Sequence, residues 1–265
     1  MNPMSTVERA QLDNTAFEAL KTADLNVLVK PYAAIGIVLA VVFLLVLITR
    51  IPLRKSAPEG LSQAFRPSVR RLWANRAYRE GVVAPFFYVG AHITCWTFII
   101  QYGTQVFMSE GMGEQDAEIR SQRLNIVAMV LFCCSRFVCT ALMRRFRPAS
   151  MLTLMASLAI MLTAIVIAVP GRVGLYCLVA VSACMSLMFP TIYGLSLRDT
   201  GPDTELGSAG LIMAILGGSL LPPVQAIFID AGNTSLSFIV PLFCFIVVCL
   251  YGIRCRSAIT KTPTQ

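Results

Sequence analysis

The amino-acid sequence predicts an all-α, polytopic membrane protein with seven transmembrane helices. Of its 265 residues, 56% are hydrophobic and only 14% are charged, against roughly 25% charged residues in an ordinary soluble domain. The apolar residues form long continuous runs, and a helix needs about 20 of them to cross a bilayer. These runs lack the polar–apolar alternation of membrane barrels. The composition therefore excludes a soluble enzyme and a disordered chain.

Seven stretches are apolar enough to be spans: 32–50, 81–106, 124–143, 149–169, 173–197, 207–229 and 234–253. Around them we expect an external segment (1–31), one isolated span (32–50), a basic cytoplasmic linker (51–80), a six-span unit (81–255) and a cytoplasmic tail (256–265). Residues 14–30 are expected to form a separate, shorter amphipathic helix on the outer face. The nine cysteines contain no CxxC pair, and the single histidine supplies no zinc-site spacing. We expect no metal or other cofactor.

The distribution of basic residues predicts the orientation. Fifteen of the 22 Lys and Arg residues fall on one side of the expected spans and six on the other, and Arg136 lies within a span. The side richer in basic residues faces the cytoplasm. This places the Arg50–Arg79 loop and the C-terminus inside, and the N-terminus outside, in a plasma membrane or bacterial inner membrane. The net charge of +8 then reflects topology, and no nucleic-acid partner is expected.

The linker between the first two spans contains the stretch SQAFRPSVRRLWANRAYRE (62–80), which mixes arginines with large apolar residues. Such a pattern favours a helix that lies on the inner leaflet, with its apolar side in the headgroup region and its arginines on anionic lipid. Membrane lipids are therefore expected partners of this segment.

Five stretches resemble one known family in the correct order. They are DLNVLVKPYAAIGIVLAVVFLLVLITRIPL (24–53), FFYVGAHITCWTFIIQY (86–102), SRFVCTALMRRFRP (135–148), ACMSLMFPTIYGLSLRDTG (183–201) and GSAGLIMAILGGSLLPPVQAIFIDAGN (207–233). Together they resemble the carboxyl-terminal half of the fucose permeases, which are sugar–proton symporters of the major facilitator superfamily. The resemblance covers about residues 24–256.

The resemblance implies a six-span facilitator half built of two inverted three-helix repeats, preceded by an isolated span that corresponds to the family's sixth. It implies transport of a small sugar, fucose-like or another hexose, by alternating access with a proton as the coupling ion. The family's first five spans are absent from this sequence. The partner that completes the transporter is then a separate amino-terminal half or a second copy of the chain.

His92, the single histidine, lies near the middle of the second span, where an ionisable side chain is costly and usually faces a polar cavity. Tyr88 and Trp96 stand four residues before and after it, so the three share one helix face. An aromatic plane with polar groups suits a sugar. Two alternatives stay open: a neutral imidazole bonded to a neighbouring helix, and an aromatic stripe that serves only packing.

Gln101 and Asn125 are further candidates for contact with the sugar. Gln101 lies nine residues after His92, about half a turn around the helix, so an unbroken helix cannot present both to one cavity. A break near Gly90 or Gly103 would change this. Asn125 lies near the outer end of the third span.

Pro190 lies inside the fifth span, in MFPTIYG. A proline frees a backbone carbonyl and bends the helix, and such bends in transporters often flank binding sites. We expect Phe189, Thr191 and Tyr193 to be directed inward by the bend. A purely structural kink is the alternative.

Arg136, Arg144 and Arg145 resemble a facilitator signature of the cytoplasmic loop between a half's second and third spans. A gating contact with the acidic RDTGPDTE loop (198–205) is one interpretation, and orientation by positive charge is the other. Small residues at spacing four in the sixth span (Gly210, Ala214 and Gly218) predict close helix packing.

Two other functions stay open at this stage. One is a truncated or regulatory half-transporter that transports nothing alone. The other is a seven-span receptor, because FPTIY resembles the receptors' NPxxY with Phe189 in place of Asn. This pattern falls in the fifth span, however, whereas receptors carry it in the seventh, and the linker after the first span is too long for that class.

Overall fold

The structure is a computed structural model that describes residues 14–48, 61–143, 145–198 and 200–261. The chain divides into two units, residues 1–61 and 62–265. The start of the expected external segment, the end of the first span, the first ten residues of the expected linker and Arg144 lie outside the described residues.

The first unit contains one long helix, α2 (Asn14–Ile48), with Pro31 inside it. Its apolar part, Val29–Leu45, is at the lower limit of what crosses a bilayer. The prediction of a separate helix over 14–30 is wrong, because the backbone stays helical through Pro31. Apolar helices tolerate such a proline where neighbouring groups satisfy the freed carbonyl.

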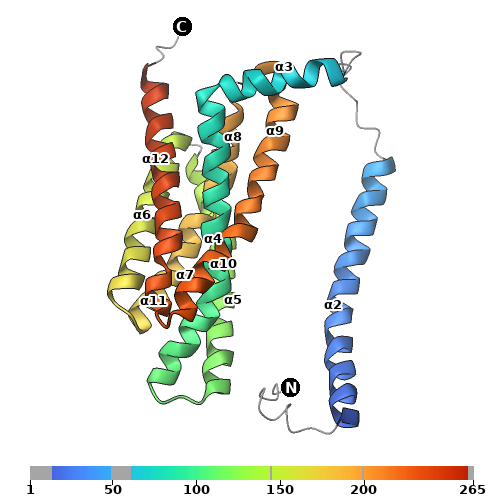
Figure 1. Ribbon diagram of the computed structural model, residues 1–265, viewed down its shortest axis with the longest axis vertical. Helices are drawn as coiled ribbons and strands as arrows, with labels where there is room; N and C mark the ends of the chain where they lie inside the picture. The colour runs from blue at the N-terminus through green and yellow to red at the C-terminus, as the bar shows by residue number, and fades with distance from the viewer. Residues whose placement is uncertain (1–13, 49–60, 144, 199, 262–265) are drawn as a thin grey trace. The chain divides into compact units, whose positions relative to one another are not determined.

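The second unit is a bundle of helices (Figure 1). Its elements are α3 (Leu61–Ala74), α4 (Arg76–Ser109), α5 (Glu114–Met143), α6 (Pro148–Ala168), α7 (Arg172–Met185), α8 (Met188–Leu197), the 3-10 turn η1 (Gly201–Asp203), α9 (Thr204–Met213), η2 (Ala214–Leu216), α10 (Gly217–Asp230), α11 (Thr234–Ser237) and α12 (Ile239–Lys261).

Six of the described segments are long and apolar enough to cross a membrane: Arg76–Ser109, Glu114–Met143, Pro148–Ala168, Arg172–Leu197, Thr204–Asp230 and Thr234–Ser257. They match the six spans predicted after the linker, with ends shifted by up to ten residues. The chain is thus an all-helical, multi-pass membrane protein. The largest shift is at the start of α5, which begins at Glu114, ten residues before the predicted start. Helix α4 begins five residues early, where Asn75 caps it by accepting hydrogen bonds from the backbone N–H groups of Ala77 and Tyr78.

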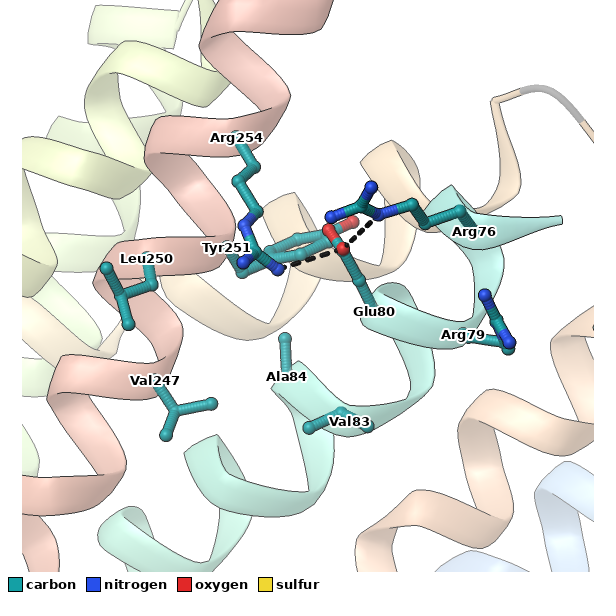
Figure 2. Close-up of a pocket in the computed structure, with 9 residues that line it drawn as sticks. All are labelled: Arg76, Arg79, Glu80, Val83, Ala84, Val247, Leu250, Tyr251 and Arg254. Atoms are coloured by element: carbon teal, nitrogen blue, oxygen red, sulfur yellow. Dashed lines mark hydrogen bonds and ion pairs between the residues drawn. The ribbon is translucent and has the colours of Figure 1, made fainter.

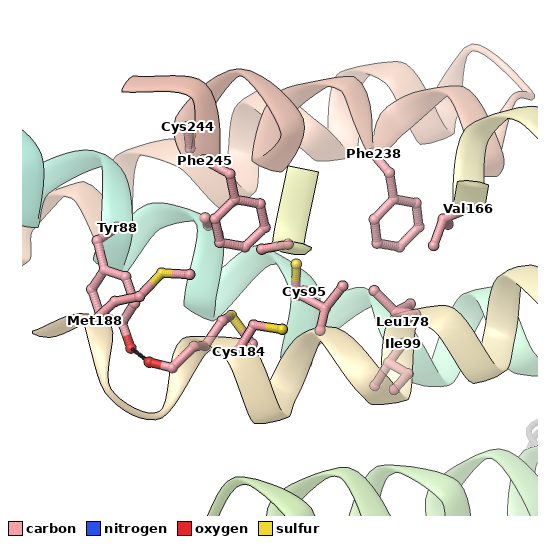
Figure 3. Close-up of a cluster of buried hydrophobic side chains, with 14 of the residues drawn as sticks. Tyr88, Cys95, Ile99, Val166, Leu178, Cys184, Met188, Phe238, Cys244 and Phe245 are labelled. Atoms are coloured by element: carbon pink, nitrogen blue, oxygen red, sulfur yellow. Dashed lines mark hydrogen bonds between the residues drawn. The ribbon is translucent and has the colours of Figure 1, made fainter. Parts of the chain in front are cut away.

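Helix α4 is the centre of the bundle and packs against α5, α7, α8, α10 and α12. Figure 3 shows part of the main buried cluster, in which Cys95 and Ile99 of α4 face Leu178 of α7 and Phe245 of α12. Each of these four side chains is at most 1% exposed. By contrast, α5 and the α9–α10 span are the two spans least covered by the rest of the unit. The central position of α4 makes it the scaffold for any site within this bundle.

Small residues bring α10 close to α4. A Cβ atom on Gly217 would collide with the backbone of Phe86, and one on Gly218 would press on the side chains of Val89 and Ile93. On α9, Gly210 lies against the hydroxyl of Tyr78. The close packing predicted for the small residues of this span is therefore confirmed.

The fifth span is broken four residues before its proline. Helix α7 ends at Met185 and α8 begins at Met188. Pro190 has no N–H to donate to the carbonyl of Ser186, so the helical ladder is interrupted at that level. Near the break, the hydroxyl of Ser186 donates to the hydroxyl of Ser135 of α5 (3.2 Å). The Ser135 hydroxyl in turn donates to the carbonyl of Ala183 (2.8 Å). These bonds hold α5 against the break.

Helix α3 lies across the end of the bundle that holds the starts of α4 and α9 (Figure 1). Its Leu72 is buried against Tyr78 and Leu211, whereas the neighbouring Trp73 remains exposed. The hydroxyl of Tyr78 donates to the carbonyl of Gly207 (3.0 Å), which joins α4 to α9 beneath Leu72. The predicted linker helix therefore exists, but one of its apolar residues packs on the protein.

Candidate functional site

A single face of α4 carries the predicted aromatic stripe. Because α4 is continuous, Tyr88, His92 and Trp96 follow one another along it, with ring centroids 5.8 Å apart for the first pair and 4.3 Å for the second. The Tyr88 hydroxyl donates to the carbonyl of Met185 (2.8 Å), and the Trp96 indole N–H donates to the hydroxyl of Ser182 (3.2 Å). Both hydrogen bonds fix α4 against α7, so the face is held rigidly on either side of His92.

Helix α5 supplies a ring that the sequence analysis did not single out. The Phe132 ring stacks on the His92 imidazole, with centroids 5.3 Å apart and an interplanar angle of 15°. The same ring meets Trp96 edge to face at 5.1 Å. Phe132 follows the candidate Asn125 by seven residues, which places both on one face of α5. This spacing is the sequence feature from which Phe132 could have been predicted.

The α8 candidates divide into two groups. Phe189 lies 6.0 Å from the Tyr88 ring and 6.2 Å from the Tyr193 ring, so both residues extend the stripe. Thr191 is buried and donates to the carbonyl of Leu187 (2.8 Å), with the sulfur of Met143 also within 3.7 Å. The hydroxyl of Thr191 thus serves the helix break and does not join the stripe. We call Tyr88, His92, Trp96, Phe132, Phe189 and Tyr193 the aromatic cluster.

Three buried polar atoms have no hydrogen-bond partner among the described residues: His92 Nε2, Asn125 Oδ1 and Gln225 Oε1. A polar group left in this condition costs about 1–3 kcal/mol, so each is a place where a ligand or water can bind favourably. Gln225 lies on α10, and its amide N–H donates to Ser237 (3.2 Å). His92 belongs to the aromatic cluster, and Asn125 lies two helical turns from Phe132 on the same face of α5.

The structure does not bring Gln101 to the aromatic cluster. No break occurs at Gly90 or Gly103, because α4 runs unbroken from Arg76 to Ser109. Gly90 and Gly103 instead face Leu221 and Ser121, respectively, at close range. Gln101 is exposed on the side of α4 opposite His92.

The acidic loop before α9 is held by an arginine other than those predicted. Arg71 of α3 donates from Nε and Nη2 to the two carboxylate oxygens of Asp203, at 2.9 and 2.8 Å. These bonds, with help from Ser68, lower the pKa of Asp203 to about 2. Arg136 instead lies over the Phe132 ring at 5.9 Å, and Arg145 is exposed in the turn after α5.

Taken together, the aromatic cluster offers flat apolar rings and an imidazole nitrogen without a partner among the described residues, and an amide oxygen in the same condition lies two helical turns away on α5. Such a surface suits a neutral polar ligand whose C–H faces lie on rings and whose hydroxyls make hydrogen bonds. No group of three or more His, Cys, Asp or Glu side chains that could hold a metal ion occurs within the part of the chain that the structure describes.

Known proteins match the chain strongly. It is 43% identical over 242 residues to an L-fucose-proton symporter of Haemophilus influenzae, and 34% identical over 230 residues to one of Escherichia coli. It is also 28% identical over 240 residues to a glucose/galactose transporter of Brucella abortus. The chain is homologous to the carboxyl-terminal portion of the fucose permeases. No protein-family model matches it.

These matches cover 89%, 86% and 91% of this chain but 54%, 51% and 56% of the relatives. The chain therefore spans about half the length of the curated relatives it matches. The relatives are transporters, which favours the transporter interpretation of the sequence over the receptor.

Solved structures agree with the sequence comparison. Two crystal structures of fucose:proton symporters, one from E. coli and one described as a major facilitator transporter in the outward conformation, match with TM-scores of 0.77 and 0.78 and 31% identity. Each match covers 96% of this chain and about 60% of the symporter. The predicted facilitator fold is thereby confirmed.

Proposed function

We propose that this chain supplies one half of a sugar–proton symporter and that the sugar binds at the aromatic cluster. The observation that carries the site is His92, whose Nε2 is buried between the rings of Tyr88, Trp96 and Phe132 and has no hydrogen-bond partner in the described part of the chain. A sugar hydroxyl bound there would satisfy this nitrogen, while the rings would cover the sugar's apolar face. The names of the relatives support L-fucose or another hexose as the substrate and a proton as the coupling ion.

The second half of the transporter is part of the proposal. Facilitators bind substrate between two halves that rock against each other, and this chain spans about half of its relatives. A separate amino-terminal half is the favoured partner, and a second copy of the chain is the alternative. Helix α5, with exposed apolar residues such as Ile126, Val130 and Phe137 along its length, offers a large surface for either partner.

Transport by reconstituted protein tests these proposals. The chain is placed in proteoliposomes alone or together with an amino-terminal half, and uptake of L-fucose, D-galactose and D-glucose is measured with and without an inward proton gradient. We expect gradient-driven uptake only when both halves are present. Uptake by the chain alone would favour the second copy, and absence of uptake and of calorimetric sugar binding in the two-half protein would favour a regulatory half.

We also propose that the N-terminus is external and that the C-terminus is cytoplasmic. The excess of basic residues on one side of the spans supports this orientation. In a cysteine-free variant in whole cells, Gln115→Cys should react with an impermeant maleimide from outside, and Ser257→Cys only after permeabilisation. The opposite pattern would reverse the orientation.

A further inference from the structure

A charged groove lies between α4 and α12, at the end of the bundle where α4 begins (Figure 2). Its volume is about 300 Å³. Arg76 and Arg79 of α4 and Arg254 of α12 line its mouth, together with Glu80. This groove lies apart from the aromatic cluster and has no role in the proposed sugar site.

The mouth of the groove carries excess positive charge. Glu80 is shared by two arginines, since both Arg76 and Arg254 donate to its Oε1 at 2.9 Å. Figure 2 shows these two side chains reaching the carboxylate from different helices. The side chain of Arg79 makes no hydrogen bond or ion pair with any residue that the structure describes. Three guanidinium groups against one carboxylate leave a net charge of +2, which can be neutralised by an anion.

The groove becomes apolar with depth. One to two helical turns from the arginines, its walls are formed by Val83 of α4 and by Val247 and Leu250 of α12. One turn further along both helices, the rings of Phe87 and Phe243 meet edge to face at 5.7 Å and continue the apolar wall. At a rise of 1.5 Å per residue, Val247 lies about 10 Å deeper along its helix than Arg254.

We propose that this groove binds an anionic phospholipid, with the phosphate at Arg76, Arg79 and Arg254 and an acyl chain along Val83, Val247 and Leu250. A soluble anion would use the charged mouth and leave the apolar walls unused. A zwitterionic lipid would bring its own cation close to the +2 mouth. Only an anionic lipid matches both parts, and basic pockets between transmembrane helices are known to suit such headgroups.

Native mass spectrometry of the full chain in a neutral detergent tests the proposal, with phosphatidylglycerol, phosphatidylethanolamine and phosphatidylcholine of identical acyl chains as probes. We expect phosphatidylglycerol to bind most tightly. Because a basic residue near an anionic headgroup contributes about 1 kcal/mol, Arg79→Ala and Arg254→Ala should each weaken its binding roughly fivefold. Arg79→Lys keeps the charge and should retain most of the affinity.

Arg147→Ala is the matched control, because Arg147 is an exposed arginine at the same end of the bundle, just before α6. It should leave phosphatidylglycerol binding unchanged. Glu80→Gln removes the one carboxylate among the described residues that line the groove and should tighten binding. The Arg79 side chain has no hydrogen bond or ion pair to lose among the described residues, so Arg79→Ala should fold even if Arg254→Ala does not. Equal binding by Arg79→Ala and Arg147→Ala, or weaker binding by Glu80→Gln, would overturn the site.

A competition arm separates a lipid from a free anion. Millimolar glycerol 1-phosphate or inorganic phosphate carries the charge of the headgroup without the acyl chain, so neither should displace phosphatidylglycerol. Displacement by either compound would show that the groove binds a free anion and does not require the acyl chain. No preference among the three lipids would likewise overturn the proposal.

Discussion

The imidazole of His92 stacks on the phenyl ring of Phe132 across two neighbouring helices, with centroids 5.3 Å apart. This contact orients the imidazole plane and leaves Nε2 without a partner among the described residues. The stacked pair is the structural basis of the first prediction.

His92→Ala should weaken sugar binding in the two-half protein by roughly five- to 150-fold. The reason is that a buried partner left unpaired costs about 1–3 kcal/mol, and 1.4 kcal/mol corresponds to a factor of ten in affinity. Trp96→Ala should act in the same direction by removing an aromatic wall. Isothermal titration calorimetry with L-fucose is the measurement.

Gln101→Ala is the control for this prediction, because Gln101 lies on the same helix but on the opposite, exposed face. The affinity of the Gln101→Ala protein for L-fucose should change by less than about twofold. A larger loss for Gln101→Ala than for His92→Ala, in protein that is folded and binds sugar, would show that the aromatic cluster is the wrong face.

Asp203→Asn should loosen α3 from the bundle, because it removes the carboxylate that accepts two hydrogen bonds from Arg71. An exposed ion pair contributes about 0.2–1 kcal/mol, so amide hydrogen exchange in α3 should rise by up to about fivefold. Glu205→Gln, a charge-matched change in an exposed residue of the neighbouring turn, should leave the exchange unchanged. Equal exchange rates in the two variants would show that the Arg71–Asp203 pair does not hold α3 on the bundle.

The pH dependence of the same contact follows from the lowered pKa of Asp203. The folded value is about 2 against an ordinary 3.8, so the pair stabilises the folded protein fully above about pH 4 and this contribution is lost as the pH falls through about 2. Exchange of the α3 amides, corrected for its intrinsic pH dependence, should therefore stay constant between pH 5 and 8. A change in this exchange between pH 5 and 8 would show that another titrating group controls the attachment of α3.

Gly217→Ala should destabilise the bundle, because the new Cβ would collide with the backbone of Phe86, which cannot move aside as a side chain can. Such overpacking costs about 1–3 kcal/mol. Gly194→Ala is the matched change in α8, where a Cβ meets nothing within 4 Å, and it should be neutral or stabilising by about 0.5–1 kcal/mol. Thermal unfolding in detergent compares the two, and a stable Gly217→Ala protein would contradict the close approach of α10 to α4.

A chain that begins at residue 62 should keep a folded bundle, because the buried clusters lie within the second unit. A chain that begins at residue 75 also loses Leu72, whose burial contributes about 1.5–3 kcal/mol, and should unfold at a lower temperature. Circular dichroism in detergent measures both. Loss of folding already in the first chain would mean that the first span is integral to the bundle.

The sequence by itself determined the features that depend on local properties. Run length and apolar content predicted six of the spans that the structure describes as long enough to cross a bilayer, since both are properties of consecutive residues. Helical spacing likewise placed Tyr88, His92 and Trp96 on one face and Gln101 on the other, because 3.6 residues complete each turn. Pro190 indicated a bend in the fifth span for an equally local reason, its missing N–H.

Tertiary structure alone decided which of these groups meet. Phe132 reaches His92, and Arg71 rather than Arg136 reaches Asp203, only because α5 packs on α4 and α3 crosses the end of α9. Such contacts depend on how whole helices pack, which is a sum of many weak interactions between residues far apart in the chain, and spacing along one helix carries no information about its neighbour.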